Sequence, residues 1–173
     1  TIRTIDGTGS DISYAWNGTD NAGAAMSDGR YLVIVSAIDS LENYSEATTA
    51  LFIDNTFPAL SIINPQDGIR VSPATYTATF SASDANGIDV LEVHAAYSNQ
   101  NISGYAAKVS TDTYQFVFDF TGIPRNTTVA INAKAFDAAG NNASQSTSVI
   151  INKDPITVES VTFENMSRTG LSS

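Results

Sequence analysis

Apolar and polar residues alternate with a period of two over most of residues 58–153. Strict alternation places one side of a strand in a core and the other in water, as two facing antiparallel sheets require. The pattern predicts seven strands: Ala59–Ile63, Tyr76–Ser83, Val90–Tyr97, Tyr105–Val109, Tyr114–Phe120, Thr128–Phe136 and Thr147–Ile151. The period of 3.6 that marks an amphipathic helix is missing throughout. We therefore predict an all-β fold with a complete seven-stranded sandwich at residues 58–153.

Residues 1–57 carry similar strand patterns, but too few of them for two facing sheets. The predicted strands are Thr1–Ile5, Ile12–Trp16, Arg30–Ile38 and Ala47–Ile53. Four strands can form one sheet, whose apolar face and open edge then need a cover. We therefore interpret residues 1–57 as the C-terminal part of a module. Residues 154–173, with a predicted strand at Thr157–Phe163, begin a further module or form a tail.

A short cassette appears twice along the chain. Asp39 is followed by Asn43, and 98 residues after Asp39 comes Asp137, which is followed by Asn141. A repeat of this length matches one immunoglobulin-type sandwich of about 100 residues. Each cassette is followed by a short linker that contains proline, which restricts the chain and limits the orientations of neighbouring modules. The repeat predicts tandem immunoglobulin/fibronectin-III-like β-sandwich modules.

Two sets of motifs carry a family resemblance. Residues 16–31 read WNGTDNAGAAMSDGRY. They resemble a W-x-G-T-D-x-x-G…D-G-x-Y signature found in the immunoglobulin-like domain of flagellar hook-capping proteins. The same signature occurs in fibronectin-III-like accessory domains of cell-envelope subtilisin-like proteases of the lactocepin type. The resemblance covers about residues 12–40 and implies that Trp16 packs in a core. From the residues themselves, Asp28-Gly29 predicts a hairpin turn, with Trp16 and Tyr31 as a cross-strand aromatic pair.

The second module resembles bacterial immunoglobulin-like repeats at both of its ends. Residues 54–58 read DNTFP, similar to an opening D-x-T-x-P motif. Residues 135–141 read AFDAAGN, similar to a closing A-x-D-x-A-G-N motif. Motifs of this kind indicate a fold, whereas a function has to be argued from a site.

Composition narrows the classes of function. The net charge is −10, of which residues 1–57 contribute −6, and this argues against nucleic acid and anionic membranes as partners. Cysteine is absent, which excludes disulfides and thiolate metal sites. No apolar run reaches the roughly 18 residues of a membrane helix, so we expect no membrane insertion. Sandwich modules without disulfides fit an extracellular or cell-surface protein of prokaryotic source.

Five side chains near the predicted module ends are calcium candidates: Asp54, Asp84, Asn86, Asp137 and Asn141. Carboxylate and amide oxygens are the hard ligands that calcium prefers. The same residue types are favoured in turns without any metal, and no EF-hand spacing is present. We place structural turns ahead of an interdomain calcium ion and leave both readings open.

The sequence offers no catalytic or cofactor-binding constellation. His94 is the single histidine, and its place in the alternation puts it on the outer side of its strand. One histidine without cysteine excludes histidine-cluster zinc sites and Cys–His dyads. A serine triad would need His94, but no G-x-S-x-G elbow accompanies it. A carboxylate pair for glycoside hydrolysis stays open, although nothing marks one.

The function predicted from the sequence is a non-catalytic extracellular accessory or spacer region of a larger secreted or cell-surface protein. The resemblance implies a subtilisin-like serine protease as the first choice of parent, with neighbouring domains of that parent as partners. The alternative is an adhesin-type module that recognises a cell-surface glycan or protein through its end loops. Exposed aromatic side chains would mark such a module, and Tyr44 and Tyr105 are the candidates.

Overall fold

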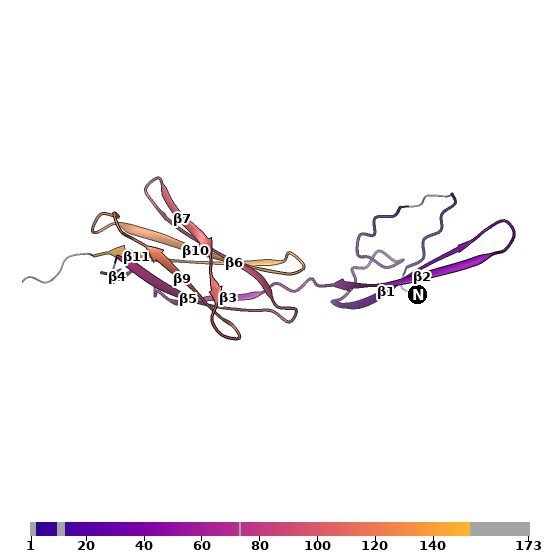
Figure 1. Cartoon of the computed structure of the whole chain (residues 1–173), viewed down its shortest axis with the longest axis horizontal. Coiled ribbons are helices and arrows are strands. Elements are labelled where there is room, and N and C mark those ends of the chain that lie inside the picture. Colours follow the sequence, from indigo (N-terminus) through magenta and orange to yellow (C-terminus); the bar gives the residue numbers. More distant parts are fainter. Residues whose placement is uncertain (1–2, 10–12, 73, 153–173) are drawn as a thin grey trace, which may run out of the picture.

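The computed structural model describes residues 3–9, 13–72 and 74–152, and its secondary structure is entirely β. Two parts lie end to end, a β-hairpin region and a sandwich, joined by a short linker (Figure 1). Within the described residues, no helix exists that could cross a membrane. The all-β prediction is confirmed.

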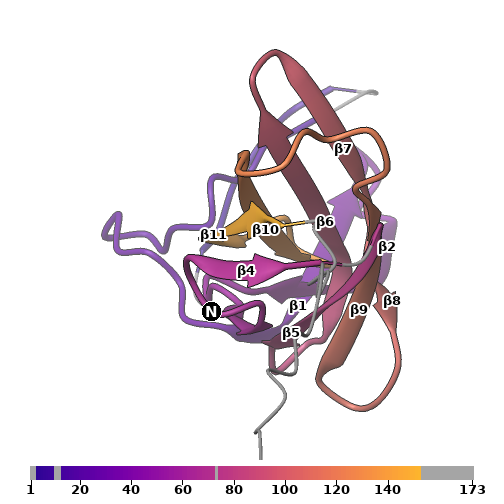
Figure 2. The same cartoon turned by 90° about the vertical axis from the view of Figure 1, so that its left-hand side faces the viewer.

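The sandwich has two facing sheets (Figure 2). The five-stranded sheet has the order β4 (Ile69–Val71), β11 (Asn142–Ile151), β10 (Thr128–Asp137), β6 (Ile88–Tyr97) and β7 (Gln100–Tyr105). The four-stranded sheet has the order β3 (Ala59–Asn64), β5 (Thr75–Ser83), β9 (Thr113–Asp119) and β8 (Ala107–Lys108). Neighbouring strands run antiparallel, except that β4 runs parallel to β11.

The core of the sandwich follows the alternation read from the sequence. On β10, every second residue from Val129 to Ala135 is at most 1% exposed, while the residues between them face outward. From the opposite sheet, Phe80 and Phe118 are fully buried, and the Phe118 ring stacks on Phe120 with 5.4 Å between centroids. Large aromatic rings supply much of the apolar area that holds two sheets together.

Several strand boundaries differ from the prediction. β4 and β7 were not expected, and the predicted strand at Tyr105–Val109 is reduced to β8, because Tyr105 ends β7 instead. β11 begins at Asn142, five residues before the predicted start. These segments are polar or very short, and they become strands because a neighbour offers backbone partners rather than because their own pattern demands it.

In the described part of the N-terminal region, one hairpin is formed by β1 (Gly29–Ile38) and β2 (Tyr44–Ile53). At the described positions 3–5 and 13–16, where strands were predicted, the chain is not a strand. A strand needs a neighbouring strand for its backbone hydrogen bonds, and the described residues offer none to these two segments. The predicted strand at Thr157–Phe163 lies outside the described residues.

The predicted aromatic pair is present, although not on paired strands. The Trp16 and Tyr31 rings meet edge to face, with centroids 6.5 Å apart, and Trp16 is half-buried. The prediction of a hairpin turn at Asp28-Gly29 is wrong, because Gly29 begins β1. The turn comes earlier, where the Gly23 N–H donates to the Asp20 carbonyl oxygen at 3.1 Å.

Candidate functional site

The linker between β2 and β3 meets the end of the sandwich where three aspartates converge. Asp54 follows β2, Asp84 follows β5, and Asp137 is the last residue of β10. Each of the three offers a carboxylate oxygen, and these oxygens all lie within 4.8 Å of one another. Asp137 is only 2% exposed, while Asp54 and Asp84 are half-buried. Residues far apart in sequence thus form one carboxylate cluster, defined here as Asp54, Asp84 and Asp137.

Asp137 is held by the turn that it begins. One carboxylate oxygen accepts hydrogen bonds from the N–H groups of Ala139 at 2.8 Å and Asn141 at 2.9 Å. The other accepts from the Asn141 amide at 2.8 Å. Burial alone would raise the pKa of Asp137, but these hydrogen bonds outweigh it, and the pKa lies below its ordinary value. The carboxylate therefore stays ionised at neutral pH.

Two asparagine side chains fasten the linker to the sandwich. The Asn86 amide donates to the Asp54 carboxylate at 2.9 Å, and the Asn141 amide donates to the Asp54 carbonyl oxygen at 3.0 Å. Asn86 is itself positioned by its own N–H, which donates to Asp84 at 2.8 Å. All five residues predicted as calcium candidates therefore lie together at this junction.

The other side of the linker is fastened by Asp28, which the sequence reading treated only as a turn residue. Its carboxylate accepts from the N–H of Asn55 at 2.6 Å, from the Asn55 amide at 2.8 Å and from the Thr56 hydroxyl. The Thr56 hydroxyl bond is the largest cause that lowers the pKa of Asp28, followed by the Asn55 N–H. No sequence signal distinguished this role, because an Asp-Gly pair is also a hairpin motif.

The donor set of the carboxylate cluster fits a hard cation. A carboxylate offers about four lone-pair sites, and hydrogen bonds from Ala139 and Asn141 occupy three of those of Asp137. Asp54 accepts from the Thr56 N–H and from Asn86, and Asp84 from the Asn86 N–H, so oxygen sites are left over on both. Calcium takes six to eight oxygen ligands, of which these carboxylates would supply three or more and water the rest.

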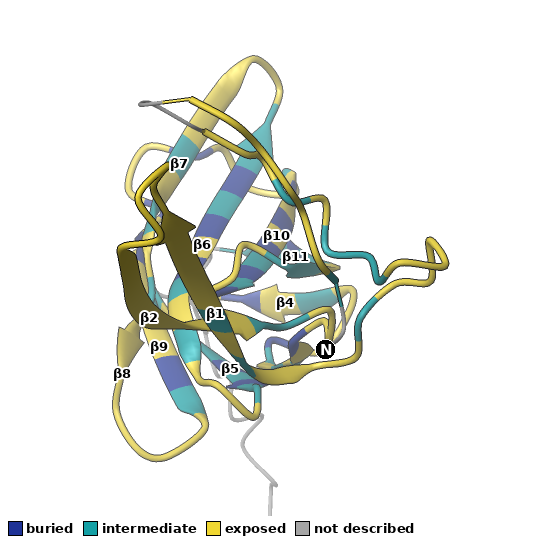
Figure 3. Ribbon diagram, turned by 90° about the vertical axis from the view of Figure 1, so that its right-hand side faces the viewer, coloured by how far each residue is buried: buried dark blue, intermediate teal, exposed yellow. Residues whose placement is uncertain are grey.

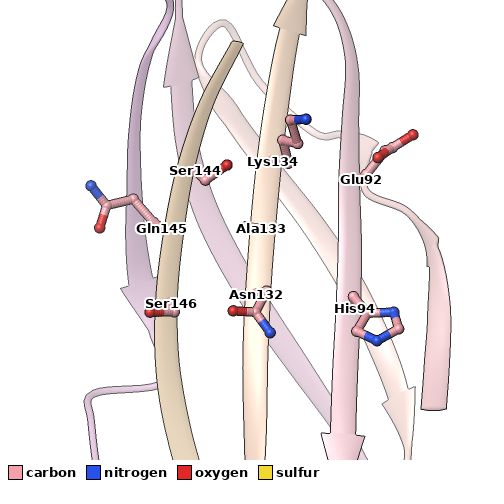
Figure 4. A pocket seen from close by; sticks show the side chains of 8 residues that line it. All are labelled: Glu92, His94, Asn132, Ala133, Lys134, Ser144, Gln145 and Ser146. Carbon is pink, nitrogen blue, oxygen red and sulfur yellow. The ribbon is translucent and has the colours of Figure 1, made fainter.

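The outer face of the five-stranded sheet carries a shallow polar hollow (Figure 4). Across the strands, Lys134 is paired with Glu92 and Ser144, and Asn132 is paired with His94 and Ser146. His94 faces outward as predicted and is partly buried. These short polar groups lie on an open sheet face, and nothing in their arrangement provides a nucleophile paired with a base.

The two candidate aromatic residues are both exposed but belong to different parts of the molecule. Tyr44 begins β2 and is 63% exposed, whereas Tyr105 ends β7 and is 68% exposed. They therefore do not form one aromatic platform at one end of a sandwich.

Comparison with known proteins adds little to this picture. No protein-family model matches the chain, and no curated protein matches it. Among solved structures, the chain is similar to the crystal structure of an engineered protein, with 21% identity and a TM-score of 0.46. The match covers 55% of this chain and only 20% of that protein. A likeness at this level carries no argument about function.

Proposed function

We propose that the chain is a non-catalytic spacer or accessory region of a larger secreted or cell-surface protein, built from tandem immunoglobulin-like modules. The sheet order supports the module type. An immunoglobulin sandwich has one sheet with the strand order A-B-E-D and a second with the order G-F-C. The four-stranded sheet here matches the first order with β3, β5, β9 and β8, and the five-stranded sheet contains the second as β11, β10 and β6. The motif resemblance makes a subtilisin-like serine protease our first choice of parent.

One observation carries the proposal: the linker is hydrogen-bonded on both of its sides. Asp28 holds Asn55 and Thr56 from the hairpin side, while Asn86 and Asn141 hold Asp54 from the sandwich side. A free linker of this length would let the two parts tumble independently. A linker fixed at both sides transmits orientation, which is the property that a spacer needs.

Pulsed electron paramagnetic resonance tests this directly. The chain has no cysteine, so Thr48→Cys on β2 and Ser146→Cys on β11, both exposed, give one pair of labels across the junction. We expect a single narrow distance distribution, which Asp28→Ala should broaden. Asp67→Ala is the matched control. The Asp67 carboxylate accepts hydrogen bonds from the N–H of Ser148 at 2.9 Å and from its hydroxyl at 2.8 Å, and neither residue belongs to the linker. A broad distribution in the parent sequence would contradict a spacer role.

The carboxylate cluster favours a second element of the proposal, in which calcium stiffens the junction. Negative charges on carboxylates whose oxygens lie within 4.8 Å of one another repel, and a divalent cation would relieve this repulsion. A cation that binds the folded junction only would raise its stability by mass action. The alternative explanation is that no cation binds, and that hydrogen bonds from the Asn86 and Asn141 amides alone stabilise the carboxylate cluster.

Thermal melts decide between the two explanations. At calcium concentrations on the order of 1 mM, typical of extracellular modules, we expect a higher unfolding temperature than in chelator. Asp84→Asn should remove the rise in unfolding temperature. Asp67→Asn should keep it, because Asp67 does not belong to the carboxylate cluster. Melts that overlay with calcium and with chelator would reject calcium and leave the hydrogen-bonded linker as the stiffening device.

A further inference from the structure

The hairpin β1–β2 is the same structural unit as the hairpin β10–β11. Nine consecutive cross-strand pairs, from Arg30↔Phe52 to Ile38↔Tyr44, coincide with Thr128↔Ile150 to Phe136↔Asn142 after a shift of 98 residues. The turns agree as well. Asp39 accepts from the N–H groups of Leu41 at 2.8 Å and Asn43 at 2.9 Å and from the Asn43 amide at 2.8 Å, as Asp137 does from its turn.

The two hairpins differ in what covers their inner faces, defined as the side of Val33 and Val35 on β1 and of Ile131 and Ala133 on β10. In β10–β11 this face is buried against the four-stranded sheet, and Val149 is 0% exposed. In β1–β2, Val35 is 62% exposed and Leu51, the counterpart of Val149, is 37% exposed. Most of the ribbon of β1 and β2 is coloured as exposed (Figure 3). Trp16 contacts Tyr31 at one end of this face, where Tyr31 and Val33 are half-buried.

The free edge of β1 differs in the same way. β10 lies between β11 and β6, whereas β1 pairs with β2 alone among the residues that the structure describes. β1 has the sequence GRYLVIVSAI, with Arg30 as its single charge. Proteins normally protect such an edge with charges, proline or a bulge, so a long, flat, apolar edge is a place where another strand pairs.

We propose that β1–β2 is half of a second sandwich, and that its other half lies in the polypeptide immediately ahead of Thr1. The occupant is the counterpart of β3, β5 and β6: a strand with apolar residues at alternate positions on the β1 edge, and an aromatic sheet on the inner face. The template strands span residues 59–97, so a shift of 98 places their counterparts in about 40 residues ahead of Thr1. This inference rests on the proposed tandem arrangement.

A second copy of the chain fits the bare face less well. Residues 1–57 carry a net charge of −6, so pairing two of these regions would bring like charge together. A self-paired hairpin would also supply Val35 and its neighbours in place of a large ring such as Phe80 of β5.

The test extends the chain by the forty residues that precede Thr1 in its own reading frame and follows amide exchange by mass spectrometry. We expect amides of β1 to exchange about a hundredfold more slowly than in the 173-residue chain. In the extended chain, Val35→Asp on the inner face should remove this protection. Ser36→Asp, the adjacent residue on the outer face, should keep it, and β10 serves as the folding control.

Three results would overturn the inference. The first is unchanged exchange of β1 in the extended chain, and the second is a reading frame with no coding sequence ahead of Thr1. The third is protection of β1 in the 173-residue chain that rises with protein concentration, which would identify a second copy as the occupant. The proposed spacer role is tested separately by pulsed electron paramagnetic resonance, where a broad distance distribution across the linker would contradict it.

Discussion

The two hairpins of this chain share a turn, a register and a repeat distance, yet one is a core element and the other is largely exposed, with only Tyr31 and Val33 of β1 half-buried. Asp39 and Asp137 organise their turns through the same three hydrogen bonds. Local sequence therefore determines the hairpin, while burial depends on the strands that a separate part of the polypeptide supplies. Most of the stability of a sheet comes from this packing, so the two hairpins should respond very differently to the same change.

The largest expected effect is on the sheet that covers β10–β11. Phe118→Ala removes a fully buried ring and should lower the free energy of unfolding of the sandwich by about 3–5 kcal/mol. Val117→Ala, one residue away and 59% exposed, should change it by less than about 0.5 kcal/mol. Urea titrations measure both values. A loss below about 1 kcal/mol for Phe118→Ala would mean that aromatic cover is not what separates the two hairpins.

The next effect compares the two turns. Asn141→Ala removes a donor from Asp137, which is 2% exposed, and should cost about 1–3 kcal/mol because a buried charge loses a hydrogen bond. Asn43→Ala is the matched change at an exposed turn and should have an effect of less than about 0.5 kcal/mol on the same unfolding transition. Equal losses would show that burial of the aspartate is unimportant.

The smallest effect is a difference in pH dependence. The pKa of Asp137 is lower in the folded chain than its ordinary value of 3.8, so Asp137 contributes stability above that pH. This contribution is lost as the pH falls through the lower, folded pKa. Asp137→Asn should therefore flatten the acid limb of the stability curve. The pKa of Asp39 is also lowered, chiefly by the Asn43 amide, but Asp39→Asn should leave the sandwich curve unchanged.

The sequence was most informative where alternation was strict. It predicted strands with one buried side at Tyr76–Ser83, Tyr114–Phe120 and Thr128–Phe136, and in the structure these ranges bury the rings of Phe80, Phe118 and Phe120. It missed β7, whose residues QNISGY include Gly104, where an added Cβ would lie 2.6 Å from the Phe116 ring. β7 forms because β6 offers it backbone partners, and Gly104 leaves room for the Phe116 ring of the opposite sheet.

The sequence predicted the aspartates of the candidate site but not the hydrogen bonds that fasten the linker. Asp54, Asp84 and Asp137 were chosen because they fall at module ends, and the structure brings their oxygens together. Asp28 was misread, since its contact with the linker joins residues 27 positions apart, and local sequence carries no sign of such a contact. Long-range hydrogen bonds of this kind appear only once the strands are placed.

Amide exchange of the 173-residue chain is the most direct test of the central claim, because it reads both hairpins in one experiment. We predict slow exchange in β10 and β11, governed by unfolding of the whole sandwich, and fast exchange through local opening in β1 and β2. Exchange rates are compared between positions 98 residues apart, which have the same turn and the same register in the two hairpins. A difference in rate therefore reports on what covers each hairpin. Protection of β1 equal to that of β10 in the monomeric chain would contradict the account, because it would show that β1–β2 needs no missing partner.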